Sequence, residues 1–78
     1  MLKSVQQLIE CAECNGYRRK TIGNHSMKVV GDTIKYYYHG NNVCTVNKTT
    51  NKVTYDDCGW GGHSSTTRCL NSYREYYN

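Results

Sequence analysis

The sequence predicts an α+β domain: an N-terminal helix, a three- to four-stranded antiparallel β-meander and a C-terminal helix, with both helices on one sheet face. Apolar residues recur at helical spacing near both ends of the chain, and short β-rich runs separated by Gly and Asn turns fill the middle. The 78 residues form one domain, residues 1–78. Its core is small, because a chain this short buries only about 60–65% of its unfolded surface.

The first predicted element is a helix whose apolar residues fall on one stripe. These residues are Leu2, Val5, Leu8, Ile9 and Ala12. Ser4 and Gln7 have the spacing of a capping box, in which two side chains satisfy free backbone N–H groups reciprocally. Asn15-Gly16 supplies a left-handed stop. The basic cluster Tyr17-Arg18-Arg19-Lys20 follows at the helix exit, where cations favour the negative end of the helix dipole.

Four β-rich runs predict the meander. They cover residues 27–30, 33–39, 43–46 and 52–55. Alternation along the second run divides its side chains between the two faces of the sheet. One face receives Ile34, Tyr36 and Tyr38, and the other receives Lys35, Tyr37 and His39. We expect the first face to pack on the helices and the second to face water.

The C-terminal helix is predicted by a second stripe behind a Ser/Thr run that would cap it. The stripe consists of Cys69, Leu70, Tyr73 and either Tyr76 or Tyr77. Trp60, the only Trp of the chain, lies just before this helix. Core packing at the junction of the last strand and the helix is the favoured interpretation for Trp60, and an exposed binding residue is the alternative.

Composition limits the function classes. Ten basic and six acidic residues give a net charge of +4, which permits nucleic acid without requiring it and argues against DNA mimicry, because mimicry needs an acidic surface. No segment has the apolar length needed to cross a bilayer, and no hydrophobic signal stretch follows Met1. We therefore expect no membrane association and a cytosolic protein, in which the five cysteines stay reduced.

Two constellations of Cys and His could carry chemistry. Cys11 and Cys14 have C-x-x-C spacing, and Cys58, His63 and Cys69 could complete a zinc site. Both residues of the C-x-x-C pair sit inside a capped helical pattern, however, so we predict no metal and no cofactor. Cys58 and His63 could form a nucleophile–base pair, but a chain this small has little room for an enclosed substrate pocket of about 300 Å³ or more. We expect no enzyme activity.

A third constellation is a polar aromatic surface. It consists of Arg18, Arg19, Lys35, Tyr37 and His39, with Trp60 as a further candidate member. Aromatic rings can stack on unpaired bases while Lys and Arg contact phosphates, which is how single strands are bound. The same residue types dominate protein–protein hot spots. The residues alone leave both uses open.

Three segments resemble a class of small, uncharacterised tailed-phage accessory proteins. They are Tyr38-His39-Gly40-Asn41-Asn42-Val43, the strand-like residues 52–55, and the stretch from Gly59-Trp60 through Ser64-Ser65-Thr66-Thr67-Arg68 to Leu70-Asn71. The resemblance implies a protein of the infected bacterial cytoplasm that binds and inhibits a host or defence protein complex, with nucleoprotein complexes among the candidates, as anti-CRISPR proteins do. It also implies a partner-contacting role for Arg68, in a monomer or homodimer.

The function expected first is therefore a non-catalytic inhibitor of such a complex. The alternative is a small basic protein that binds single-stranded nucleic acid. A zinc-stabilised interaction module is the third possibility.

Overall fold

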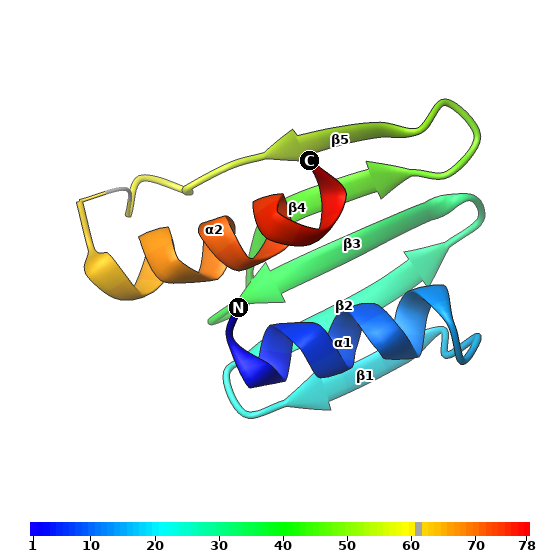
Figure 1. Ribbon diagram of the computed structural model, residues 1–78, viewed down its shortest axis with the longest axis horizontal. Coiled ribbons are helices and arrows are strands. Elements are labelled where there is room, and N and C mark those ends of the chain that lie inside the picture. Colours follow the sequence, from blue (N-terminus) through cyan, green and yellow to red (C-terminus); the bar gives the residue numbers. More distant parts are fainter. Residues whose placement is uncertain (61) are drawn as a thin grey trace.

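Two helices cover one face of a five-stranded antiparallel sheet in the computed structural model, which describes residues 1–60 and 62–78 (Figure 1). The elements are α1 (Lys3–Glu13), β1 (Arg19–Ile22), β2 (His25–Val30), β3 (Thr33–Tyr38), β4 (Asn41–Asn47), β5 (Lys52–Tyr55) and α2 (Ser64–Tyr77). The predicted α+β class is confirmed, with a helix at each end and both helices on the same sheet face. The sheet has one strand more than the four predicted.

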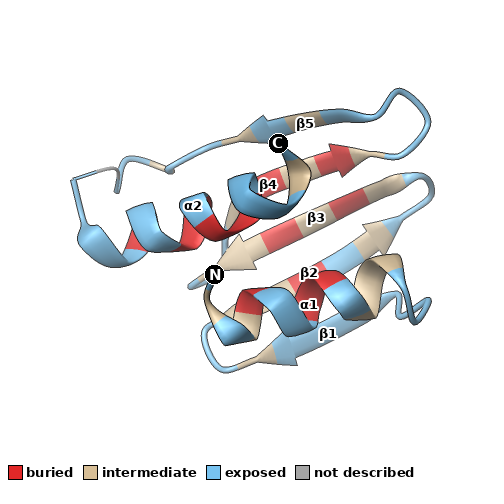
Figure 2. Ribbon diagram, viewed as in Figure 1, coloured by how far each residue is buried: buried red, intermediate tan, exposed pale blue. Residues whose placement is uncertain are grey.

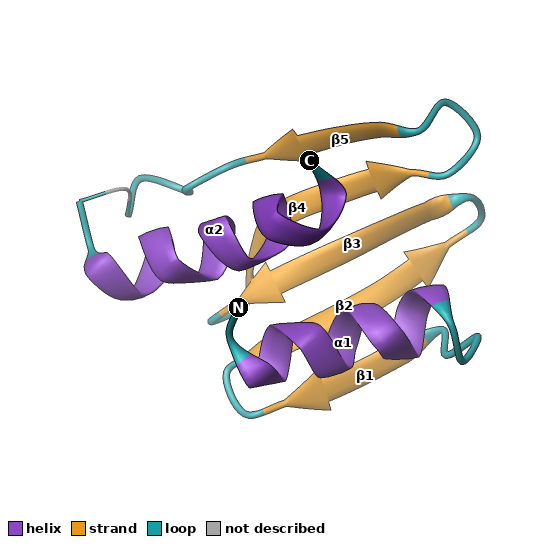
Figure 3. Ribbon diagram, in the orientation of Figure 1, coloured by secondary structure: helices purple, strands orange, loops and turns teal. Residues whose placement is uncertain are grey.

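The strands follow one another in space in the order of the sequence, so the sheet is a simple meander (Figure 3). The additional strand is β1, which pairs with β2 at one edge. Its sequence, Arg-Lys-Thr-Ile, contains one apolar residue, and its first three residues are exposed. Half of the basic cluster expected at the exit of α1, Arg19 and Lys20, therefore belongs to an edge strand.

The core lies between the sheet and the helices, and both helices turn their buried stripe toward the strands (Figure 2). The largest buried side chains are Tyr36, Tyr73, Leu8, Ile9 and Met27. The predicted stripes are confirmed on α1 and on α2, where Tyr77 packs against the core and Tyr76 stays 49% exposed. Tyr36 joins sheet and helix, because its ring lies 4.6 Å from that of Tyr73 and its hydroxyl lies 2.6 Å from that of Tyr77.

The start of α1 differs from the prediction. The residue preceding the helix is Leu2 and no side chain caps it, so the predicted capping box of Ser4 and Gln7 is wrong. The chain is held there by tertiary contacts instead. The Leu2 N–H donates to Ser72 Oγ on α2 at 2.9 Å, and the terminal amino group lies 3.2 Å from Glu75.

The other helix ends give one correction and one confirmation. The residue preceding α2 is His63, and the Ser/Thr run lies inside the first turn without a side-chain cap at that residue, so the predicted hydroxyl cap is wrong. At the end of α1 the predicted left-handed stop is present, because Gly16 has φ of 71°. None of the helices in the described part of the chain is long and apolar enough to span a membrane.

The β3–β4 hairpin contains a bulge and a tight turn. The register shifts between Tyr36, which pairs with Cys44, and Tyr37, which pairs with Asn42. Val43 is the extra residue, so Val43 and Cys44 are both buried although they are neighbours. At the turn, His39 has φ of 51° and leaves the strand, and the predicted placement of its side chain beside Lys35 and Tyr37 is therefore wrong.

Candidate functional site

The sheet face opposite the helices carries a row of three cations, which we call the cationic row. Arg19 of β1 lies directly opposite Lys28 of β2, and Lys28 lies directly opposite Lys35 of β3. Directly opposed residues project to the same side, with Cβ atoms about 4.5–5.5 Å apart. The alternation that buries Met27, Ile34 and Tyr36 against the helices therefore sends the cationic row to the other side, the open face.

In the described part of the chain, no carboxylate forms an ion pair with these three cations. None of the five strands contains Asp or Glu, and the acidic side chains lie on helices and connecting segments. They are Glu10, Glu13, Asp32, Asp56, Asp57 and Glu75. Within residues 1–60 and 62–78, the ion pairs are Lys48 with Glu13 at 2.7 Å and the amino terminus with Glu75. The cationic row takes part in neither, so the open face presents unneutralised positive charge.

Tyr37 lies on the same face, two residues beyond Lys35 along β3. It is half-buried between its cross-strand neighbours Ser26 and Asn42. A shallow hollow of about 260 Å³ lies beside its ring and is lined in part by Arg19 and Lys28. An aromatic side chain and two cations thus border one depression.

A second depression, the Trp60 groove, lies at the end of the sheet where the β3–β4 turn meets the segment before α2. Its volume is about 400 Å³. The lining residues are Tyr38, His39, Asn41, Val43, Asp57, Cys58, Trp60, His63, Ser65 and Thr66. Trp60 is 51% exposed, and its ring lies 5.0 Å from that of His63. The favoured interpretation of Trp60 as a buried anchor is therefore wrong.

The groove does not favour a cysteine nucleophile. Cys58 and His63 both line it, but the Cys58 thiol donates to the Asn42 carbonyl at 3.3 Å. Desolvation, with the nearby carboxylates of Asp56 and Asp57, raises the pKa of the Cys58 thiol. A raised pKa lowers the fraction of thiolate, which is the reactive form.

A second Cys–His contact, not expected from sequence, lies in the core. The Cys69 sulfur is 3.8 Å from His25 Nδ1, and Cys69 is fully buried. Burial raises the pKa of the Cys69 thiol to about 11. Cys69 therefore packs the interior beneath α2, and its raised pKa lowers the fraction of the reactive thiolate.

The residues considered as metal ligands are distributed over three regions. Cys11 lies on α1 and Cys14 directly after its end, Cys58 and His63 line the Trp60 groove, and Cys69 is in the core. Across the described residues no group of three or more His, Cys, Asp or Glu side chains is arranged to hold a metal ion. All five cysteines are free thiols.

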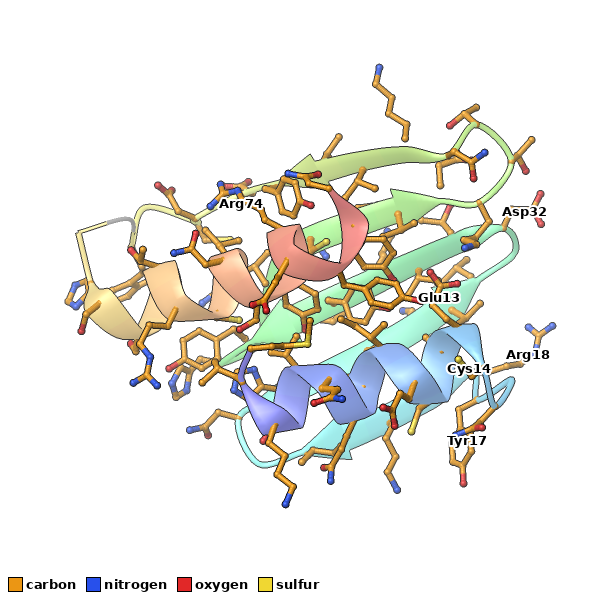
Figure 4. All side chains as sticks on the ribbon, viewed as in Figure 1. Glu13, Cys14, Tyr17, Arg18, Asp32 and Arg74 are labelled. Carbon is orange, nitrogen blue, oxygen red and sulfur yellow. The ribbon has the colours of Figure 1, made fainter. Side chains whose placement is uncertain are left out.

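The residues predicted to contact a partner separate into four places. Arg19, Lys35 and Tyr37 meet on the open face, and His39 and Trp60 line the groove. Arg18 lies before β1 and projects away from the end of the molecule (Figure 4). Arg68 is exposed on α2, on the side of the sheet that the helices cover, and borders a hollow near Met1 and Asn71.

Lys28 belongs to the site and was missed by sequence reasoning. The signal was present, because Gly31 and Asp32 form a two-residue connection that pairs Val30 with Thr33. A connection of fixed length sets the register of a hairpin, and this register places Lys28 opposite Lys35.

In comparisons with known proteins, no family model, curated protein or solved structure matches the chain.

Proposed function

We propose that this protein is a non-catalytic nucleic-acid-binding protein that holds a single strand on the open face of its sheet. The observation that carries the proposal is the cationic row, in which Arg19, Lys28 and Lys35 lie in direct register without a carboxylate partner in the described chain. Phosphates of a nucleic-acid strand that follows the cationic row from β1 to β3 would neutralise all three charges.

The cationic row is unfavourable in the free protein, and this favours a functional origin. Like charges directly opposite each other in a sheet destabilise it. Lys28 has such a neighbour on both sides, Arg19 and Lys35. A polyanion removes this repulsion on binding, so the same arrangement that weakens the free sheet strengthens the complex.

Tyr37 and the placement of the helices favour a single strand over a duplex. A half-exposed aromatic ring beside cations can stack on an unpaired base, which a duplex does not offer. Major-groove readers insert a helix or a two-stranded ribbon into the duplex. Here α1 and α2 cover the face opposite the cationic row (Figure 1).

The second candidate function is inhibition of a host or defence protein complex in the cytoplasm of a phage-infected bacterium. The resemblance to phage accessory proteins suggests it, and the observation that favours it is the exposure of Trp60. Trp is enriched at the energetically dominant positions of protein interfaces. In this case the groove would be the contact surface, and the cationic row would serve a nucleoprotein target.

The test measures the binding of end-labelled single strands and matched duplexes by fluorescence anisotropy over a range of salt concentrations. If three phosphates are neutralised, the logarithm of the association constant should fall against the logarithm of salt with a slope of about −2. The double variant Lys28→Gln/Lys35→Gln should bind more weakly, and its salt slope should be shallower than that of the parent by about 1.4.

The matched control is Lys3→Gln/Arg68→Gln, which removes the same charge from exposed positions on the helix side. It should bind like the parent protein. Equal losses in both double variants would mean that net charge alone attracts the strand and would contradict a site on the open face.

A pull-down from host lysate with and without nuclease separates the two candidate functions. A protein partner that stays bound after nuclease treatment supports the inhibitor.

A further inference from the structure

The Trp60 groove and the open face meet at the β3–β4 turn. Gly40 lines the hollow beside Tyr37, and its neighbour His39 lines the groove. Tyr37 and Tyr38 are consecutive residues of β3 and project to opposite faces, so the hollow lies on the open face and the groove on the helix side of the same strand end. A chain lying along β3 on the open face therefore reaches the groove by passing one turn.

The lining of the groove suits a planar, uncharged ring. Four ring-bearing side chains contribute to it, Tyr38, His39, Trp60 and His63. Tyr38 and His39 have ring centroids 4.3 Å apart, and Trp60 and His63 have centroids 5.0 Å apart. Asn41 and Ser65 add exposed hydrogen-bonding groups. Aromatic faces can stack on a base while such groups contact its polar edge.

Charge disfavours a phosphate in the groove and weakens the case for a cation. None of the described lining residues is Lys or Arg, so the groove offers a phosphate no permanently charged side chain. The acidic lining residue is Asp57, and its Oδ1 already accepts the Gly59 N–H at 2.9 Å. The volume of about 400 Å³ lies within the range of small-molecule sites, which begins at about 300 Å³.

We propose that the Trp60 groove binds an unpaired base of the same nucleic-acid strand that the cationic row holds by its phosphates. This inference rests on the proposed function. The strand would run from the cationic row over Tyr37, pass the His39–Gly40 turn and place a base against Trp60. The site then has two parts. The cationic row neutralises phosphates, and the groove binds one base, so the rest of the strand is bound without sequence preference.

Trp60 makes the groove directly observable, because it is the only Trp of the chain. Its intrinsic fluorescence should be quenched when a base stacks on the indole. The experiment titrates the parent protein with a labelled single strand, recording anisotropy of the label and Trp60 emission in parallel. The probes are a homothymidine strand and a strand of equal length in which the bases are replaced by abasic sites.

We expect both strands to bind in low salt, because both carry the phosphates that the cationic row needs. Only the thymidine strand should quench Trp60. Trp60→Ala should weaken binding of the thymidine strand by about tenfold, which corresponds to one lost stack, and leave the abasic strand unaffected. Tyr76→Ala is the matched control, since Tyr76 is equally exposed but lies on α2 outside both surfaces.

The outcomes separate this inference from the proposed function. If the thymidine strand binds through Lys28 and Lys35 but Trp60 emission stays constant and Trp60→Ala binds like the parent, the inference is overturned and the proposed function stands. Equal quenching by the abasic strand also overturns it, because the response then needs no base. If no strand binds the parent protein, both fail together.

Discussion

At the scale of single residues, the Asn42 side chain on the open face makes three hydrogen bonds at the β3–β4 bulge. Its Nδ2 donates to the carbonyls of Tyr36 at 3.0 Å and Cys44 at 3.2 Å, and its Oδ1 accepts from the Thr45 hydroxyl at 2.9 Å. These bonds span the bulge at which Val43 is turned into the core. The side chain therefore replaces ladder hydrogen bonds that the bulge interrupts.

Asn42→Ala should lower the free energy of unfolding by about 1–3 kcal/mol, because it removes the side-chain donor from two part-buried backbone carbonyls. Denaturation by urea measures this difference. Asn41→Ala is the control, since Asn41 is the adjacent residue of the same type but is exposed on the turn side. Equal stability of the two variants would show that the bulge does not depend on the amide.

Trp60 shows where inference from single residues stops. Core packing at the junction of the last strand and α2 was the favoured interpretation, yet the core is filled by Tyr36, Tyr73 and the helix stripes without it. Whether a large ring fits a core depends on the space that other elements leave, which is a property of packing. Exposure of Trp60 removes the stability role expected for it and leaves binding as its predicted use.

At the scale of elements, the sequence predicts those whose periodicity is local. The helices and four strands follow from apolar spacing and turn residues, since side chains of one element report which face it buries. The strand β1 carries no such pattern, because only Ile22 packs against the core and the strand is held by pairing with β2. The predicted capping box of α1 was wrong because the contact at the start of this helix is not local. The Leu2 N–H donates to Ser72, which lies near the other end of the chain.

The cationic row is also a property of elements, because it needs three strands in one register. In the free protein, Lys28→Gln removes both like-charge contacts of the row. We expect this variant to be more stable than the parent at low salt by up to about 1 kcal/mol. The gain should shrink at high salt, where exposed charges are screened.

Urea denaturation at two salt concentrations provides the measurement. Lys3→Gln is the control, because Lys3 is exposed on α1 and faces no cation in a sheet. A Lys28→Gln variant that is less stable than the parent at low salt would contradict the assigned repulsion. It would show that the Lys28 stem contributes more by packing than its charge costs.

At the scale of the whole molecule, charge and burial divide the protein into two sides. Acidic groups lie on the helices and at the ends of strands, whereas the open face carries Arg19, Lys28, Lys35 and Lys52 without an acid in any strand. Such a division orients the molecule toward a polyanion before contact and raises its rate of association at low salt. Under the proposed function, the open face is therefore the side that a nucleic acid would meet first.

The interior has the opposite character, because it holds thiols and phenols that ionise only at high pH. Burial raises the pKa of the Cys44 thiol to about 12 and that of Cys69 to about 11. Burial also raises the pKa values of Tyr36, Tyr73 and Tyr77. The Tyr73 hydroxyl has no hydrogen-bond partner within the described residues, which adds to the cost of any charge there.

Alkaline pH should therefore destabilise the whole domain. Above about pH 9 the unfolded chain releases the thiol protons of Cys44 and Cys69 while the folded protein keeps them, so the free energy of unfolding falls as pH rises toward 11. Each group contributes up to about 1.4 kcal/mol per pH unit. Urea denaturation across this interval should show a shallower decline in Cys69→Ala than in the parent, whereas Cys14→Ala, at an exposed position, should follow the parent. Parallel curves for Cys69→Ala and the parent would show that the Cys69 thiol ionises as readily in the folded protein as in the unfolded chain, and so that α2 does not close the core over it.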